Sequence, residues 1–343
     1  MRVFITGGTG LIGRNLVRRL AERGDQPVIL SRRADQVRRD PTMRTHEIVQ
    51  GDPTTEGPWQ RAVDGCDAVV NLAGHNIFAE RWNPQVKRKI RDSRVHSTEN
   101  LIAALRASRN APRVLVQSSA IGYYGTPTET ELTEASPSGS DFMAVVCREW
   151  EETALPAEEL GVRLAVIRTG IVLARGEGAL GVITPIFKWV PFGAAPVGSE
   201  GRPLKPGTGQ QWMSWIHVDD ITGILLLALD NTQAAGPING TAPHPVRNAE
   251  FSKALAKVLW RPYVPFGPPD SVLRVLLGGV TEVITKGQKV LPARAQALGY
   301  VFKYPNLNEA LRAIFAKDTA VPKADANPAS RTALPQHHHQ HHH

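Results

Sequence analysis

The sequence predicts an α/β fold in which helices cover both faces of a doubly wound parallel sheet, followed by a smaller C-terminal α+β lobe. Short β-branched runs alternate with helical periodicity over the first two-thirds of the chain, the pattern of βαβ units. A glycine-rich turn also directly follows the first of these runs. With 343 residues, 42% of them hydrophobic, the chain can bury a large core without disulfides.

The expected elements follow from these patterns in chain order. Strands are predicted at 3–6, 27–31, 47–50, 68–72, 114–117 and 164–168. A first helix places Ile12, Leu16 and Leu20 on one face. A second begins at Asn83-Pro84, because Asn caps a helix and Pro suits its first turn. Later helices are expected at 142–154, 218–230 and 248–260.

Between residues 174 and 212 Gly and Pro become dense. This predicts a long loop without regular structure on the substrate side of a site. The segment 262–315 is expected to form a small mixed lobe, so that 174–316 is the substrate lobe. From 317 to 343 the composition predicts a disordered tail with a His-rich end, which is either an engineered tag or a native run.

The first turn carries Thr6-Gly-Gly-Thr-Gly-Leu-Ile-Gly13 between a strand and a helix. Gly7 permits the tight turn, Gly10 lets the backbone approach a pyrophosphate, and Gly13 allows close helix packing. The turn residues are therefore expected to bind a dinucleotide: Gly7, Thr9, Gly10, Leu11, Ile12 and Gly13. The alternative is a plain glycine turn. We expect residues 1–173, with part of 212–245 returning to them, to form a Rossmann domain.

The second predicted strand closes with Leu30-Ser31-Arg32-Arg33. A carboxylate at this point would accept a hydrogen bond from a free ribose 2′-hydroxyl and repel a phosphate. Ser31, Arg32 and Arg33 instead offer a hydroxyl and two guanidinium groups. The sequence therefore predicts NADP(H) rather than NAD(H); the alternative is that both arginines belong to a solvated loop.

The fourth predicted strand ends in Asn71-Leu72-Ala73-Gly74. Small residues there would let a cofactor lie against the backbone, so all four are predicted cofactor contacts. A simple exit from strand to loop is the alternative.

Other function classes find little support. The net charge of +8 attracts anions, but no basic run is interleaved with aromatics, so nucleic-acid binding is not expected.

Cys66 and Cys147 lack metal-ligand spacing, which predicts no metal site and a reducing cytoplasm. Because the sequence opens as a strand, we expect no signal peptide, and its longest apolar stretch, 221–229, is too short to span a membrane. The oligomeric state stays open.

Together with the two motifs above, Ser118-Ser-Ala-Ile-Gly-Tyr-Tyr-Gly125 and Trp215-Ile-His-Val-Asp-Asp220 resemble the extended short-chain dehydrogenase/reductase superfamily. With Gly287-Gln-Lys-Val-Leu-Pro292, the chain is similar to its atypical "epimerase family" group, described as nucleoside-diphosphate-sugar epimerase-like or cell-division-inhibitor-like. The resemblance spans residues 1 to about 315. It implies a Rossmann domain with a smaller substrate lobe and adds Ser118, Arg94 and Arg168 as cofactor-side residues. A structural ion pair is the alternative role for each arginine.

The chain departs from the superfamily in its catalytic residues. There, a Tyr-x-x-x-Lys pair on the helix after the fifth strand transfers a proton, because the Lys ammonium lowers the Tyr pKa. Here the two alignments place Phe142 with Val146, or Met143 with Cys147, at these positions. Ala120 stands at the usual Ser or Thr position. The standard proton-transfer groups are therefore missing.

The nearest phenols are those of Tyr123 and Tyr124, with Ser119 and His217 as proton partners. We predict Tyr123 and Ser119 as the catalytic residues; structural packing is the alternative. The first functional hypothesis is an NADP-dependent oxidoreductase or epimerase-like enzyme that acts on an unidentified small or nucleotide-sugar-like substrate. The second is a non-catalytic NADP(H)-binding module that regulates a protein partner, as the loss of the usual catalytic groups would predict.

Overall fold

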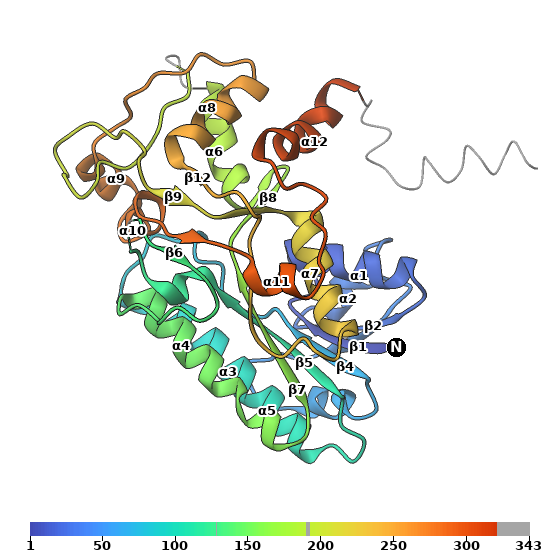
Figure 1. Ribbon diagram of the computed structural model, residues 1–343. Coiled ribbons are helices and arrows are strands. Elements are labelled where there is room, and N and C mark those ends of the chain that lie inside the picture. Colours follow the sequence, from blue (N-terminus) through green and yellow to red (C-terminus); the bar gives the residue numbers. More distant parts are fainter. Residues whose placement is uncertain (128, 190–192, 321–343) are drawn as a thin grey trace, which may run out of the picture.

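The computed structural model describes residues 1–127, 129–189 and 193–320 (Figure 1). Its central sheet has seven strands in the order β11-β7-β5-β4-β1-β2-β3, and every neighbouring pair is parallel. The strands are β1 (Arg2–Thr6), β2 (Gln26–Ser31), β3 (Glu47–Gln50), β4 (Ala68–Asn71), β5 (Val114–Ala120), β7 (Arg163–Thr169) and β11 (Gly236–Gly240). The strand order reverses between β1 and β4, where such sheets bind their ligands. The predicted α/β class is confirmed.

Helices cover both faces of the sheet; α1 buries one apolar stripe, whereas α7 is buried on nearly all sides. On one face, α1 (Leu11–Glu22) and α7 (Val218–Asp230) share a core that includes Leu16, Leu20 and Ile224. On the other face lie α3 (Pro84–Ala107), α5 (Pro156–Glu159) and the 3-10 helix η1 (Pro58–Val63). Figure 1 shows α4 (Phe142–Ala154) beside α3. As predicted, Asn83 caps α3 by accepting the Val86 N–H at 2.8 Å.

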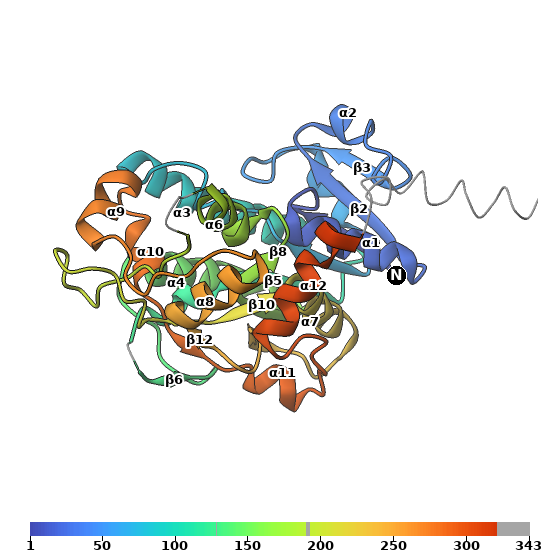
Figure 2. The same ribbon diagram turned by 90° about the horizontal axis from the view of Figure 1, so that it is seen from above.

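The C-terminal lobe is built from short elements around a second core that contains Trp215, Phe251 and Leu255. The elements are β8 (Ile171–Ala174), α6 (Gly178–Trp189), β9 (Trp212–Met213), β10 (Trp215–His217), β12 (Val246–Arg247), α8 (Asn248–Val258), α9 (Asp270–Leu277), α10 (Thr281–Thr285), β13 (Lys289–Val290), α11 (Ala293–Ala297) and α12 (Leu307–Ala320). Three further elements complete the chain: α2 (Ala34–Val37), the 3-10 helix η2 (Ile121–Tyr124) and β6 (Glu131–Leu132). Figure 2 shows α9 and α10 at the end of the molecule away from β2 and β3.

The prediction that 174–212 lacks regular structure is wrong, because α6 lies within it. Its apolar residues Leu180, Ile183 and Phe187 recur at helical spacing and pack into the core of the lobe. That burial stabilises a helix despite Pro185 in its interior. The density of Gly and Pro concealed this apolar periodicity.

The end of the last helix and one strand of the sheet also differ from the sequence prediction. Helix α12 continues to Ala320, four residues into the predicted tail; the rest of that tail, with its His-rich end, lies outside the described residues. Strand β11 was not predicted, because Gly-Pro-Ile-Asn-Gly lacks a β-branched run. Among the described helices none is long and apolar enough to cross a membrane.

Candidate functional site

The glycine turn between β1 and α1 leaves a helix N-terminus open. Gly7 has a φ of +68°, and a Cβ atom there would lie 2.6 Å from the Leu72 carbonyl oxygen. Gly10 is the N-cap of α1 but provides no side-chain cap, and the first turn contains no acidic residue. The N–H groups at the start of α1 therefore remain available to an anion. Thr9 and Gly10 are exposed, whereas Leu11 and Ile12 are half-buried.

Gly13→Ala is expected to lower the free energy of unfolding, by about 1–3 kcal/mol from overpacking. Its Cβ atom would overlap the backbone of Gly7 and Gly8. The sign is diagnostic, because Gly to Ala inside a helix otherwise stabilises by about 0.5–1 kcal/mol. Urea denaturation measures the effect, with Arg18→Ala on the exposed face of α1 as control. A stabilised Gly13→Ala protein would contradict this turn geometry.

At the end of β2, two guanidinium groups stand without partners. The Ser31 hydroxyl oxygen accepts the Arg33 N–H at 3.0 Å. The Gln50 side chain holds the same bend through the Arg32 carbonyl oxygen, at 2.6 Å, and the Ala34 N–H, at 2.9 Å. Arg32 and Arg33 are exposed, and no ion pair engages either one within the described chain. These side chains are free to meet an anionic group beside Ser31.

Asn71 is fully buried and joins neighbouring elements of the sheet. Its Oδ1 accepts the Thr6 hydroxyl at 2.6 Å, and its Nδ2 donates to Thr98 at 3.1 Å and to Gln117 at 3.0 Å. The Thr6 hydroxyl oxygen in turn accepts the N–H groups of Leu72 and Ala73. This network fixes the backbone of Leu72 and Ala73 directly after β4. The Asn71 amide therefore positions these two residues through the Thr6 hydroxyl.

Arg94, on α3, lies behind Gly74; the residue is half-buried, but its Nε atom is buried completely. One guanidinium nitrogen donates to the carbonyl oxygens of His75 and Ile90 at 2.9 and 3.1 Å. Its Nε is buried without a hydrogen-bond partner, and burial lowers the pKa of Arg94 to about 10. In the described chain no carboxylate forms an ion pair with it. A buried cation with an unsatisfied N–H fits a polar ligand group at the end of β4.

Arg168, on β7, forms an ion pair. This is the alternative to a cofactor-side role that the sequence left open for it. Its guanidinium is buried and meets Glu151 at 2.8 and 2.9 Å. Burial opposes its charge, but the hydrogen bonds from Arg168 to Glu151 raise the pKa of Arg168 overall. The guanidinium also lies 3.6 Å from the ring centroid of Tyr123 and donates to the Tyr124 hydroxyl at 3.0 Å. The described side chains thus surround this arginine.

The two predicted catalytic residues lie close to this ion pair. The Ser119 hydroxyl donates to Glu151 at 2.6 Å. Tyr123 is half-buried with its ring against Arg168, and the Tyr124 hydroxyl donates to Asn239 at 2.6 Å. Ser118 is half-buried on β5. The structure therefore gathers Ser119, Tyr123 and Arg168 into one cluster.

His217, considered as a proton partner, caps α7 instead. Its Nδ1 accepts the Asp219 N–H at 2.9 Å, and its ring stacks on Tyr304 with a centroid distance of 4.1 Å. Burial lowers the pKa of His217, although Asp219 and Asp220 act in the opposite direction. The neutral ring is the form that can cap the helix, because a protonated Nδ1 accepts no hydrogen bond.

Between pH 7.5 and 5.5, we expect the free energy of unfolding to fall less in His217→Asn than in wild type. The unfolded chain binds this proton near the ordinary pKa of 6.5, and the folded chain only below it. Stability from neutral His217 is therefore complete above pH 6.5 and declines as the pH falls towards the folded pKa. Asn retains an N-cap acceptor but does not titrate. Urea unfolding at pH 7.5 and 5.5 measures the difference; equal pH dependence in both proteins would contradict a buried neutral His217.

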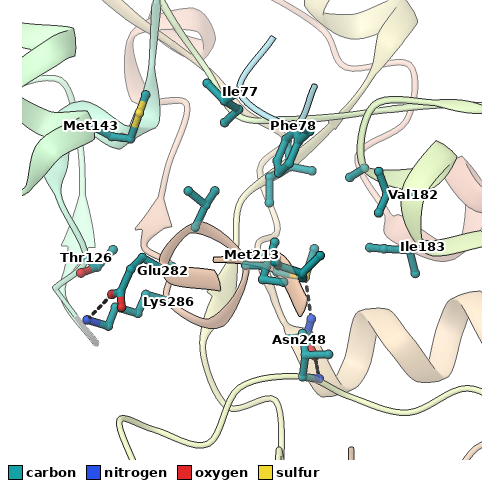
Figure 3. Close-up of a pocket in the computed structure, with 18 of the residues that line it drawn as sticks. Ile77, Phe78, Thr126, Met143, Val182, Ile183, Met213, Asn248, Glu282 and Lys286 are labelled. Atoms are coloured by element: carbon teal, nitrogen blue, oxygen red, sulfur yellow. Dashed lines mark hydrogen bonds and ion pairs between the residues drawn. The ribbon is translucent and has the colours of Figure 1, made fainter. Parts of the chain in front are cut away.

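A cavity of about 980 Å³ opens beyond the carboxyl ends of β5 and β7. Its wall at the sheet includes Leu11, Ala120, Ile121, Thr169 and Gly170. Figure 3 shows apolar side chains that face the cavity from several elements: Ile77, Phe78, Met143, Val182, Ile183 and Met213. The described lining residues include neither Ser119 nor Tyr123.

The cavity also accounts for residues that sequence reasoning left undecided or missed. Ala120 and both residues that the two alignments offer for the catalytic Tyr, Phe142 and Met143, line it. Cys147 is buried, and burial raises the pKa of its thiol to about 12, so it is not a reactive thiolate at neutral pH. Trp212 lines the cavity and Trp215 lies in the core of the lobe. Sequence reasoning missed that α9 and α10 contribute residues to the cavity wall. The signal in the sequence was the apolar stripe of residues 270–277, which is typical of a helix with one buried face.

Comparisons with known proteins cover most of the chain. The model of the NAD dependent epimerase/dehydratase family matches residues 3–239, and that of a domain of unknown function, DUF1731, matches residues 268–314. The chloroplastic epimerase family protein SDR39U1 homolog of Arabidopsis thaliana is 44% identical over 320 residues, covering 92% of this chain and 86% of that protein. The epimerase family protein YfhF of Bacillus subtilis is 34% identical over 318 residues, covering 92% and 98%.

Two solved structures illustrate the structural likeness. Human epimerase family protein SDR39U1 (isoform 2), solved with NADPH, has 33% sequence identity and a TM-score of 0.78, covering 92% of this chain and 99% of that one. UDP-glucose 4-epimerase of Thermus thermophilus, in complex with NAD, has 19% identity and a TM-score of 0.72, covering 94% and 100%. The second likeness is one of fold alone.

Proposed function

Because this chain belongs to the NAD dependent epimerase/dehydratase family, we propose that it binds NADP(H) and acts as an oxidoreductase or epimerase-like enzyme on a small substrate. The observation that carries the cofactor assignment is the pair of unpartnered guanidinium groups, Arg32 and Arg33, beside the Ser31 hydroxyl. The human structure with NADPH supports the same choice. The two buried, unpaired cysteines support a cytoplasmic location.

The residues present fit this cofactor at three points. The Gly10 N–H donates to the Gly7 carbonyl oxygen, so the open N–H groups of Leu11, Ile12 and Gly13 would hold its diphosphate. Ser31, Arg32 and Arg33 would hold the adenosine 2′-phosphate. Arg94, with its unsatisfied Nε, would hold a polar group towards the nicotinamide end, where Leu72, Ala73 and Gly74 offer backbone contact. The nicotinamide, when bound, supplies hydride chemistry. Ser118, on β5, is proposed as a further cofactor contact. Arg168, on β7, is proposed to position Ser119 indirectly, because both side chains bind Glu151.

We expect NADPH to stabilise the protein far more than NADH does. At a free concentration one hundred times the dissociation constant, a ligand adds about 2.7 kcal/mol to the free energy of unfolding. Thermal denaturation with each cofactor in turn measures this directly. Equal stabilisation by both cofactors, or stabilisation by NADH alone, would contradict the assignment of NADP(H).

Tyr123 is the proposed proton donor and Ser119 its hydroxyl partner. Ser119 lies at the carboxyl end of β5 and Tyr123 on η2 directly after it, both near the Arg168 cation, and neither is among the described lining residues of the cavity. The test is Tyr123→Phe, which keeps the ring over Arg168 and removes only the hydroxyl. If Tyr123 is a general acid, turnover should fall by about 100-fold or more, with unchanged NADPH affinity. Turnover at the wild-type rate would remove Tyr123 from the mechanism.

A second candidate function is a non-catalytic NADP(H)-binding module that reports cofactor state to a protein partner. It is favoured by the loss of the usual catalytic groups: Ala120 stands at the Ser or Thr position, and neither alignment, Phe142 with Val146 or Met143 with Cys147, supplies a group that transfers protons at neutral pH. NADPH binding without nicotinamide oxidation across a panel of carbonyl compounds would favour this module. Turnover with any member of the panel would favour the enzyme.

A further inference from the structure

We infer that the cavity beside the proposed cofactor site takes an apolar molecule with few polar groups, such as a medium-chain ketone, and not a sugar nucleotide. This inference rests on the proposed function only for the cavity's role as the substrate site. It names the chemical class of that substrate, which the family does not fix.

The apolar character of the wall is the first argument. Phe78, Val182 and Ile186 line the cavity and are 38%, 48% and 52% exposed. Large apolar side chains are seldom gathered at one concave surface unless a ligand or partner covers them. Met143 and Ile183, on facing elements, continue the same surface (Figure 3). An apolar occupant would bury all of these side chains together.

The charged lining residues form the second argument, because most of them already have partners, although the Arg274–Glu282–Lys286 group keeps one net positive charge. Glu282 meets Lys286 at 2.8 Å and Arg274 at 2.5 Å, as Figure 3 shows for the first pair. Asp141 accepts the Ala144 N–H at 2.9 Å and so caps α4. Lys87 is the remaining cation of the described lining, and it lies 5.0 Å from the ring centroid of Phe142. A diphosphate would find no pair of free cations here.

The two amide side chains of the lining are also engaged, which leaves the hydroxyl groups of Thr126 and Thr169 as its neutral polar groups. The Gln288 amide donates to the carbonyl oxygens of Ile121 and Gly125 at 3.2 and 2.9 Å. Asn248 accepts the Val197 N–H at 2.9 Å and contacts the Met213 sulfur. A sugar presents several hydroxyl groups, each of which loses water on entry and needs a new partner. A single carbonyl group carries far less of this penalty.

The test titrates 2-alkanones from 2-heptanone to 2-undecanone by calorimetry into the protein loaded with NADP⁺, which cannot reduce them, with UDP-glucose in parallel. Each added methylene buried in an apolar wall should lower the dissociation constant roughly fourfold. UDP-glucose is expected to bind more weakly than 2-undecanone. Chain-length independence, or tighter binding of UDP-glucose, would overturn the inference.

A matched pair of variants places the binding in this cavity. Val182→Asp puts a carboxylate into the apolar wall and should weaken 2-undecanone binding at least tenfold. Val275→Asp makes the same change on α9 at a residue that is 70% exposed and outside the cavity lining, and should leave it unchanged. NADPH affinity, measured first, should be equal in both. Failure of NADPH to bind wild type rejects the proposed function, whereas NADPH binding with equal alkanone affinity in both variants rejects only the apolar substrate site.

Discussion

Replacing Arg32 and Arg33 together by alanine is expected to weaken NADPH binding about 100-fold while NADH binding stays within a few-fold of wild type. A charge-assisted hydrogen bond contributes about 1.5–3 kcal/mol, and the lower value for two exposed guanidinium groups gives about 3 kcal/mol, or two powers of ten. Because NADH lacks the 2′-phosphate, it loses none of these contacts. Fluorescence titration of each reduced cofactor measures both constants.

The control is the double variant Arg39→Ala with Arg44→Ala. These arginines are exposed in the same stretch of chain and outside any ion pair of the described residues, and their removal changes the net charge equally. It should reduce NADPH affinity only through the general field, an effect that disappears at high salt. If both double variants lose the same affinity, the preference for NADPH comes from net charge and not from the end of β2.

The sheet was predictable because buried parallel strands appear in sequence as β-branched runs. The five runs from β1 to β5 and the run of β7 have this signature, and β11 does not, since Gly236-Pro-Ile-Asn-Gly240 is held by pairing with β7. Helix α6 was missed for a related reason. Its stability comes from packing in the C-terminal lobe, which outweighs the local cost of Pro185.

The places of the expected cofactor-side residues were predictable to the extent that topology fixes them. The first βα turn and the end of the second strand have set places in such a sheet, so the positions of Gly10 and Arg32 in the fold followed from sequence, and their contact with a cofactor stays a prediction. The environment of Arg94 could not, because its buried, unsatisfied Nε depends on the approach of α3 to the exit of β4. Nor could the bond of Ser119 to Glu151, which joins β5 to α4. Local sequence does not encode contacts of this kind.

Glu151→Ala is expected to be the most destabilising substitution, lowering the free energy of unfolding by about 3–5 kcal/mol. The variant leaves the Arg168 guanidinium, whose side chain is 4% exposed, as a buried charge without its carboxylate. It also removes the acceptor of the Ser119 hydroxyl. Urea denaturation at neutral pH measures the loss, and Glu151→Gln, which retains an acceptor but not the charge, should lie between wild type and Glu151→Ala.

The matched control lies two residues away on the same helix. Glu149 pairs with Arg91 at 2.8 Å, but both side chains are more than a third exposed, so Glu149→Ala should cost no more than about 1 kcal/mol. Both variants remove one carboxylate from α4 and gain the same helix propensity, so the difference between them isolates the buried charge. If the two variants are equally stable, solvent reaches Arg168, and its guanidinium would then be free to contact a bound ligand instead of acting only through Glu151.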